Sequence, residues 1–296
     1  MPLKNARERY PLHQSPLYKM RGKGQFERVL GIGWDSVDGL LHPTNYRVWL
    51  NKKGREIQQP VGPALAAVHV RIARLLGRIE LPDYLFSRKG RSYVDNARRH
   101  VGSVPLIKTD IHKFYPSVTW EMVYRLFVSE FQCAADIAHR LADICCYRRM
   151  HLPTGSALSG RLAFLATRRM FDEIDNLASA KGCRMTAYVD DITVSGSKAT
   201  KQLLSEIRKT VRRHGLKTKQ RKSTAYSSSA AKAVTGVIVS GKGLSLPNAR
   251  HLRIRETRRA IASATGRMRD RLTESLRGRI QEASQILGAD RRDPRK

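Results

Sequence analysis

Residues 185–194 read MTAYVDDITV, an apolar run interrupted by two adjacent aspartates. The alternation of apolar residues slips its phase across Asp190 and Asp191. Such a slip is expected where two strands are joined by a turn, because successive side chains in a strand point to opposite faces. The sequence therefore predicts a β-hairpin with a turn at these two aspartates.

Two adjacent carboxylates repel each other, and a divalent cation is the usual compensation. Asp110 lies near the end of a second short apolar run, 106–111, which is typical of a buried strand. If that strand lies beside the hairpin, three carboxylates converge, and such a site can hold two Mg²⁺ ions about 3.5 to 4 Å apart. The alternative, from the residues alone, is a solvated turn, for which Asp-Asp is well suited.

The net charge of the chain indicates what kind of molecule it binds. The chain has 296 residues, with 56 Lys plus Arg against 25 Asp plus Glu and a net charge of +31. Because 41% of the residues are hydrophobic, the composition supplies a packed core and excludes a wholly disordered basic tail. The basic excess favours a polyanion such as nucleic acid, although a membrane surface or an acidic protein also satisfies it.

Residues 1–20 contain no apolar stretch typical of a signal peptide, and no window approaches the roughly 18 apolar residues of a spanning helix. We therefore expect no membrane partner and a cytoplasmic location. The four cysteines show no metal-ligand spacing and are expected to be buried thiols.

Apolar spacing predicts most of the remaining elements. Helices are expected at 64–79, 120–131, 134–146, 161–180, 201–213 and from about 248 onward, and a strand at 233–240.

The residues around the acidic pair resemble the palm motifs of reverse transcriptases. YVDD at 188–191 is preceded by DIHKFY at 110–115 and by LPTGS at 152–156, in that family's order. Two further stretches are similar to signatures of retron reverse transcriptases, namely NARRH at 96–100, for the motif N-A-x-x-H, and VTG at 234–236.

This resemblance implies an α+β fold of the right-hand polymerase type, with fingers, a palm built on an antiparallel sheet, and a helical thumb. The expected boundaries are 1–104 for fingers that include an N-terminal basic segment and the N-A-x-x-H region, 105–240 for the palm, with interleaved fingers helices around 118–150, and 241–296 for the thumb.

The resemblance also implies an RNA-directed DNA polymerase that binds its own structured non-coding RNA. It would start DNA synthesis from a guanosine 2′-hydroxyl of that RNA, use deoxynucleoside triphosphates, leave an RNA–DNA product, and serve anti-phage defence with a separate effector protein. Two other interpretations stay open. One is another bacterial reverse transcriptase, intron-like or defence-associated, and the other is a non-catalytic RNA-binding scaffold with the same fold.

Several residues match functional positions of the family. Asp110, Asp190 and Asp191 match the catalytic aspartates that bind two Mg²⁺ ions, and Ile111 adds a backbone carbonyl. The nucleotide-binding positions are Arg55 in the fingers hairpin, Tyr115 beneath the incoming sugar, Thr154 and Gly155 in the loop, and Lys222 near the departing pyrophosphate.

Some of these matches are weaker than others. Thr154 stands where glutamine is commonest, and Ala157 and Gly160 replace usual prolines. Arg55 is equally compatible with a solvated basic turn. The positions expected to bind RNA are Asn96, His100, Thr235, Gly236, Arg258, Arg267 and Arg271.

Overall fold

The computed structural model describes residues 9–288, which form two compact units. The outermost parts of the predicted N-terminal basic segment and thumb, residues 1–8 and 289–296, lie outside the described residues. Within the described residues, the first unit comprises 9–82, Ile111–Asp172 and Arg213–Leu216, and the second comprises Asp83–Asp110, Glu173–Arg212 and 217–288.

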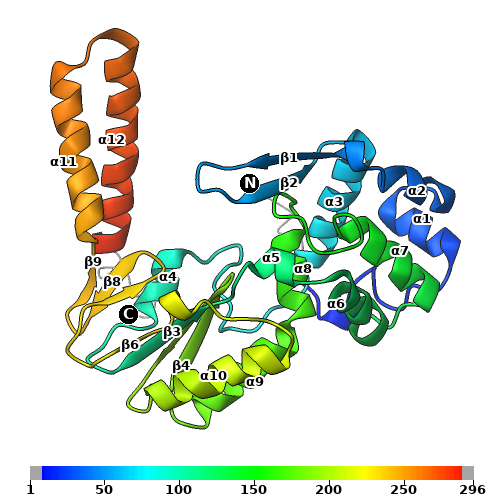
Figure 1. Cartoon of the computed structure of the whole chain (residues 1–296), viewed down its shortest axis with the longest axis horizontal. Helices are drawn as coiled ribbons and strands as arrows, with labels where there is room; N and C mark the ends of the chain where they lie inside the picture. Colours follow the sequence, from blue (N-terminus) through cyan, green and yellow to red (C-terminus); the bar gives the residue numbers. More distant parts are fainter. Residues whose placement is uncertain (1–8, 289–296) are drawn as a thin grey trace, which may run out of the picture. The chain divides into compact units, whose positions relative to one another are not determined.

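The first unit is mainly helical and carries one long hairpin (Figure 1). Strands β1 (Tyr46–Leu50) and β2 (Glu56–Pro60) pair in antiparallel fashion. The helices and short turns are η1 (Leu12–Gln14), α1 (Lys23–Leu30), η2 (Trp34–Ser36), α2 (Val37–Leu40), η3 (Pro43–Asn45), α3 (Pro63–Leu76), α5 (Phe114–Ser117), α6 (Trp120–Arg125), η4 (Leu126–Glu130), α7 (Ala135–Cys145), α8 (Ser159–Ala166) and the start of α9 (Arg168–Ser179).

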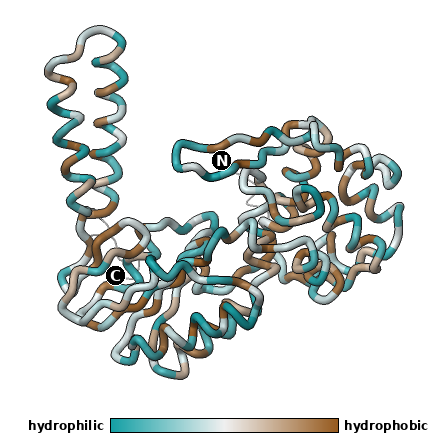
Figure 2. The backbone as a smooth tube through the Cα atoms, viewed as in Figure 1, coloured by the Kyte–Doolittle hydropathy of each residue, from teal (hydrophilic) through white to brown (hydrophobic). Residues whose placement is uncertain are grey.

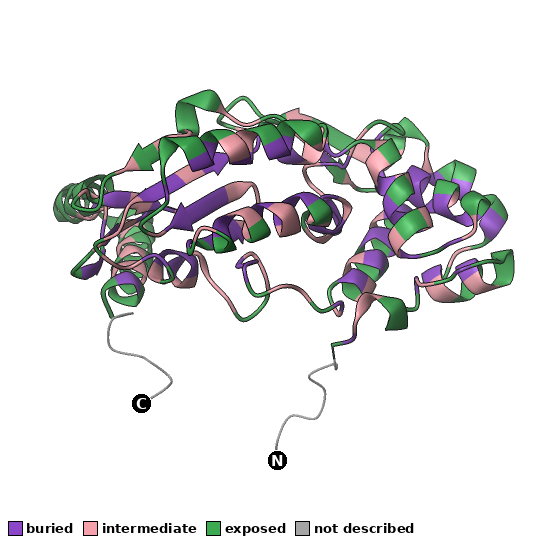
Figure 3. Cartoon of the chain, turned by 90° about the horizontal axis from the view of Figure 1, so that it is seen from below, coloured by how far each residue is buried: buried purple, intermediate pink, exposed green. Residues whose placement is uncertain are grey.

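A four-stranded antiparallel sheet forms the centre of the second unit, in the order β4-β5-β3-β6. Its strands are β3 (Leu106–Asp110), β4 (Arg184–Tyr188), β5 (Asp191–Ser195) and β6 (Thr224–Tyr226). Helix α9 and helix α10 (Lys201–Arg213) lie beside the sheet (Figure 1). The sheet residues are mostly buried, while the outer sides of the helices are exposed (Figure 3).

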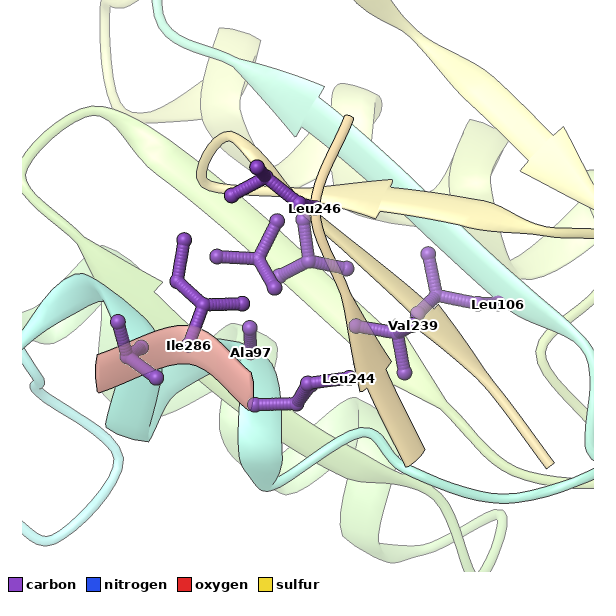
Figure 4. Close-up of a cluster of buried hydrophobic side chains, with 9 residues drawn as sticks. Ala97, Leu106, Val239, Leu244, Leu246 and Ile286 are labelled. Carbon is purple, nitrogen blue, oxygen red and sulfur yellow. The ribbon is translucent and has the colours of Figure 1, made fainter. Parts of the chain in front are cut away.

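A smaller sheet of β7 (Lys232–Val234), β8 (Val237–Ser240) and β9 (Gly243–Ser245) packs against α4 (Tyr93–Arg98). Helices α11 (Asn248–Ser263) and α12 (Gly266–Leu287) follow it as an antiparallel pair of mixed hydropathy (Figure 2). One apolar cluster joins α4, the small sheet and the end of α12 (Figure 4). Its members are Val94, Ala97, Leu106, Val234, Val237, Val239, Leu244, Leu246 and Ile286.

The α+β polymerase fold predicted from the sequence is confirmed, and so are the helices expected at 64–79, 134–146 and 201–213. The helix expected at 161–180 is instead two helices, since the chain leaves helical geometry at Thr167, whose hydroxyl donates to the carbonyl of Ala163 at 2.8 Å. Similarly, the stretch at 120–131 is α-helical only to Arg125 and continues as a π-helical turn.

Three further details differ from the sequence prediction. The strand expected at 233–240 is a hairpin, because Thr235 and Gly236 both take positive φ and form its two-residue turn. The catalytic-motif turn consists of Val189 and Asp190, while Asp191 already belongs to β5. Residues 83–104, assigned to the fingers, belong to the second unit, where α4 contacts β4 and β8. Within residues 9–288, no helix has the length and apolar character needed to cross a membrane.

Candidate active site

Strand pairing in the second unit brings three aspartates to one end of the sheet. Asp110 is the last residue of β3 and lies opposite Asp191, the first residue of β5. Asp190 directly precedes Asp191 in the hairpin turn. Asp110 is only 2% exposed, and the other two residues are half-buried. The convergence predicted from the sequence is therefore a consequence of antiparallel register.

These carboxylates affect one another electrostatically. Burial, and then the negative charge of Asp110, raises the pKa of Asp190 to about 6. The pKa of Asp191 is also raised, by burial first and Asp110 second. Because desolvation and like charges both disfavour ionised carboxylates, the group is stabilised by nearby positive charge.

Two lysines supply such charge. The Lys222 ammonium lies 2.7 Å from Oδ2 of Asp110, and this hydrogen bond is the main reason that the pKa of Lys222 is raised. Lys219 donates to Oδ1 of Asp110 and lies 3.8 Å from Oδ2 of Asp190. Its backbone N–H also donates to the Asp110 carbonyl at 2.7 Å.

Lys219 is a site residue that sequence reasoning missed. The signal lies in sheet topology rather than in a motif. β6 pairs with β3, with Lys108 opposite Thr224, so the turn η5 (Gln220–Lys222) before β6 must end beside the end of β3. That turn brings both lysines to Asp110.

The donor chemistry of the three aspartates suits Mg²⁺, which prefers hard oxygen ligands. Ile111 follows Asp110 directly and offers the backbone carbonyl expected from the family match. Across residues 9–288, however, no three His, Cys, Asp or Glu side chains are grouped as a ready metal site. Because each carboxylate oxygen of Asp110 is paired with a lysine, a bound ion would share or compete for these oxygens with the two ammonium groups.

The predicted nucleotide-binding residues other than Lys222 lie in the first unit. Arg55 is exposed and follows the turn of the β1–β2 hairpin, whose Gly54 has a φ of 67°. Tyr115 is partly buried on α5. Their contacts with a nucleotide stay predictions.

Hydrogen bonds attach Thr154 and Gly155 to β2. The Thr154 amide donates to Oε1 of Gln58 at 3.0 Å, and its hydroxyl donates to the Glu56 carbonyl at 2.8 Å. The Gly155 amide donates to the carbonyl of Gln58 at 3.0 Å, and a Cβ at Gly155 would lie 2.8 Å from that oxygen. The loop is thereby fixed to the hairpin, and Thr154 is engaged within the protein.

The expectation of direct RNA contact by Asn96 and His100 disagrees with their burial, since each is only 1% exposed. The His100 ring bonds through Nδ1 to the hydroxyl of Ser195 and through Nε2 to that of Thr186, both at 2.7 Å. It therefore fastens the base of the β4–β5 hairpin. Burial lowers the pKa of His100 to about 3, and the charges of Arg184 and Arg99 act in the same direction.

Thr235 and Gly236 also serve internal packing. The Thr235 hydroxyl donates to the carbonyl of Tyr93 at 2.8 Å and accepts from Asn96 at 3.4 Å. The N-A-x-x-H and V-T-G stretches thus contact each other inside the second unit. By contrast, the predicted RNA-binding residues of the thumb are exposed on α11 and α12, and these are Arg258, Arg267 and Arg271.

Comparison with known families gives a match to the model described as reverse transcriptase (RNA-dependent DNA polymerase), over residues 37–252. This span contains both the aspartates and the residues of the β1–β2 hairpin.

Two retron enzymes are similar to this chain in sequence. The chain is 26% identical over 219 residues to the retron Ec86 reverse transcriptase of Escherichia coli, covering 71% of this chain and 68% of that protein. It is 28% identical over 150 residues to the retron Se72 reverse transcriptase of Salmonella heidelberg, covering 50% of this chain and 39% of that protein. Among solved structures, a foamy viral protease-reverse transcriptase in complex with double-stranded DNA is 13% identical with a TM-score of 0.43, covering 80% of this chain and 35% of that chain.

Proposed function

This chain belongs to the reverse transcriptase family of RNA-dependent DNA polymerases, and on that premise we propose that it is a retron-type enzyme that copies its own structured RNA into DNA. The observation that carries the proposal is the register of the palm sheet, which puts Asp110 opposite Asp191 and beside Asp190. The similarity to retron enzymes supports the retron assignment.

In this proposal the three aspartates and the Ile111 carbonyl hold two Mg²⁺ ions. Ions held by these residues would supply activation of a hydroxyl nucleophile and neutralisation of charge on the leaving phosphate. The elevated pKa of Asp190 and Asp191 supports an acidic group that is stabilised by added cations. Lys222, and with it Lys219, neutralises Asp110 before substrate arrives and can donate to phosphate oxygens once released.

The first unit and the thumb bind the substrates. Arg55 would hold triphosphate oxygens through its fork of donors. Tyr115 would lie beneath the incoming sugar, and the loop of Thr154 and Gly155 would border the nucleotide. The exposed arginines of α11 and α12 would contact phosphates of the RNA and its RNA–DNA product.

The catalytic assignment is tested with Asp190→Asn plus Asp191→Asn. We expect this variant to lose Mg²⁺-dependent extension of oligo(dT) on polyadenylate while retaining its RNA affinity. The matched control is Asp35→Asn plus Asp136→Asn, which removes the same charge from two exposed positions of the first unit. Persistent extension by the palm variant would refute the assignment.

The finer proposal concerns priming and biology. We expect DNA synthesis to begin at a guanosine 2′-hydroxyl, and the polymerase, its RNA and a separate effector to act in anti-phage defence. Nucleic acid purified with the protein from its host should contain DNA joined to RNA through a 2′-5′ linkage that a debranching enzyme cleaves. Linear DNA would contradict the assignment to retron enzymes and would favour a different priming mechanism. Plating efficiency of phage on cells with the Asp190→Asn plus Asp191→Asn chain tests the defence role.

A further inference from the structure

The tip of the β4–β5 hairpin has an unusual backbone. Tyr188 pairs with Asp191, so Val189 and Asp190 alone form the loop. Val189 has a φ of 57°, in the left-handed region. Glycine is the usual residue at a positive φ in such short turns, and a β-branched residue there is a genuine outlier. Strained positions of this kind persist only where the surrounding structure holds them.

One hydrogen bond provides such a restraint. The Val189 amide donates to the hydroxyl oxygen of Ser87 at 3.1 Å. Both residues belong to the second unit. The bond joins the hairpin tip to a segment about a hundred residues earlier in the chain.

The segment that carries Ser87 is itself firmly attached. It runs along the outer edge of β4, where the Ala187 amide donates to the Tyr84 carbonyl and the Phe86 amide donates to the Ala187 carbonyl, both at 2.8 Å. Tyr84, Leu85 and Phe86 are all buried. Ser87 is therefore presented to the tip by a segment that an isolated β-bridge between Leu85 and Ala187 fixes to β4.

The restraint on Val189 mainly affects the orientation of Asp190. Asp191 is fixed by its strand pairing with Asp110 and Tyr188, whereas Asp190 lies in the loop and its direction depends on the backbone angles of Val189. A group that fixes Val189 therefore fixes where the Asp190 carboxylate points. Partners that orient metal ligands in this way typically change metal affinity or activity by about 10- to 100-fold when removed.

We propose that Ser87 is a positioning residue for the metal-binding carboxylates, acting through the Val189 amide. This inference rests on the proposed function, because it assumes that Asp190 binds the divalent ion. Neither the acidic motif nor the N-A-x-x-H stretch includes Ser87, so the role arises only from the fold.

The test compares Ser87→Ala with Ser87→Thr in the full chain. Mn²⁺ binding, followed by electron paramagnetic resonance without nucleotide, reports the site independently of catalysis. We expect Ser87→Ala to weaken Mn²⁺ affinity about tenfold and to raise the Mg²⁺ concentration needed for half-maximal DNA synthesis by a similar factor. Ser87→Thr keeps a hydroxyl and should behave like the wild type.

A second variant separates positioning from general destabilisation. Glycine adopts a positive φ without strain, so adding Val189→Gly to Ser87→Ala should restore most of the lost Mn²⁺ affinity. A purely structural loss would not be rescued in this way.

Wild-type Mn²⁺ affinity in the Ser87→Ala protein would overturn the inference, as would an equal loss in Ser87→Thr. If Mn²⁺ binding depends on Ser87 while the wild type makes no DNA, the proposed function fails and the positioning role stands.

Discussion

The buried histidine of the N-A-x-x-H stretch predicts a specific loss of stability in acid. The pKa of His100 is lowered to about 3 in the folded protein, chiefly by burial, against 6.5 for an ordinary histidine. Below pH 6.5 the His100 imidazole therefore becomes protonated in the unfolded chain but stays neutral in the folded chain. His100 therefore does not lower the free energy of unfolding above pH 6.5, and it lowers that free energy progressively as the pH falls from 6.5 toward 3.

The size of this effect follows from the shift. Between pH 6.5 and pH 5, over about 1.5 pH units, His100 is protonated only in the unfolded chain. At 1.36 kcal/mol per unit this lowers the unfolding free energy by about 2 kcal/mol. His100→Gln has no imidazole to titrate, so its unfolding free energy should fall by about 2 kcal/mol less than that of the wild type between pH 7.5 and pH 5.

Urea unfolding at the two pH values measures this difference, whatever the absolute stability of the variant. Circular dichroism at 222 nm follows the helices of both units. All three tryptophans, Trp34, Trp49 and Trp120, lie in the first unit, so their fluorescence follows that unit alone. His100→Gln should reduce the pH dependence of the dichroism transition, to which the helices of the second unit contribute.

A matched control is available in the first unit. His69 is 1% exposed, bonded to the hydroxyl of Ser156 and to the carbonyl of Ile144, and burial lowers its pKa to about 4. His69→Gln should therefore reduce the acid sensitivity of the fluorescence transition. If His100→Gln and the wild type lose the same free energy between pH 7.5 and pH 5, the reasoning about His100 is wrong.

Three other changes have direct expectations. Tyr115→Ala should increase incorporation of ribonucleotides relative to deoxyribonucleotides, as measured by the ratio of kcat/KM values, and unchanged discrimination would contradict its placement beneath the sugar. Replacing Arg258, Arg267 and Arg271 with alanine should lower the slope of log RNA affinity against log salt by about 2 to 3, because each lost phosphate contact removes about 0.7 to 0.9. Gly155→Ala forces a Cβ to within 2.8 Å of a carbonyl oxygen of β2, so it should lower the unfolding free energy by about 1 to 3 kcal/mol in urea titration, and an unchanged midpoint would contradict the close approach.

Local pattern predicted the central site well. The phase slip of the apolar alternation indicated the hairpin, and the run ending at Asp110 indicated its neighbour, as strand pairing confirms. The same pattern placed the turn one residue late, because it does not show that Val189 takes a left-handed conformation. Likewise, the T-G pair at 235–236 gave no clear turn signal, since threonine is β-branched and the usual first residue of such turns is asparagine, aspartate or glycine.

Other site residues depend on pairings between distant segments. Lys219 reaches Asp110 because β6 joins β3, and Ser87 reaches Val189 because its segment runs along β4. Neither pairing leaves a periodic signal in the sequence. These residues are identifiable only once the order of the strands is known.

The segments that carry the two retron-like stretches contact each other and the helices α11 and α12. Tyr93, next to the N-A-x-x-H stretch, donates to Glu282 of α12 at 2.7 Å, and Arg250 of α11 lies 3.0 Å from the same carboxylate.

The carbonyl of Tyr93 accepts from Thr235, and Ile286 of α12 joins the apolar cluster around Ala97 and Val234. These contacts attach α11 and α12 to α4 and to the small sheet of β7–β9, and Leu106 of β3 belongs to the same apolar cluster. A substitution such as Thr235→Val removes a hydroxyl from this joint, so it should weaken RNA binding through the placement of α11 and α12. Because α11 and α12 carry the arginines proposed to contact phosphates, their displacement should also lower the slope of log RNA affinity against log salt. Weaker RNA binding with an unchanged slope would instead indicate direct contact by this stretch, because the neutral hydroxyl of Thr235 releases no counterion when it binds.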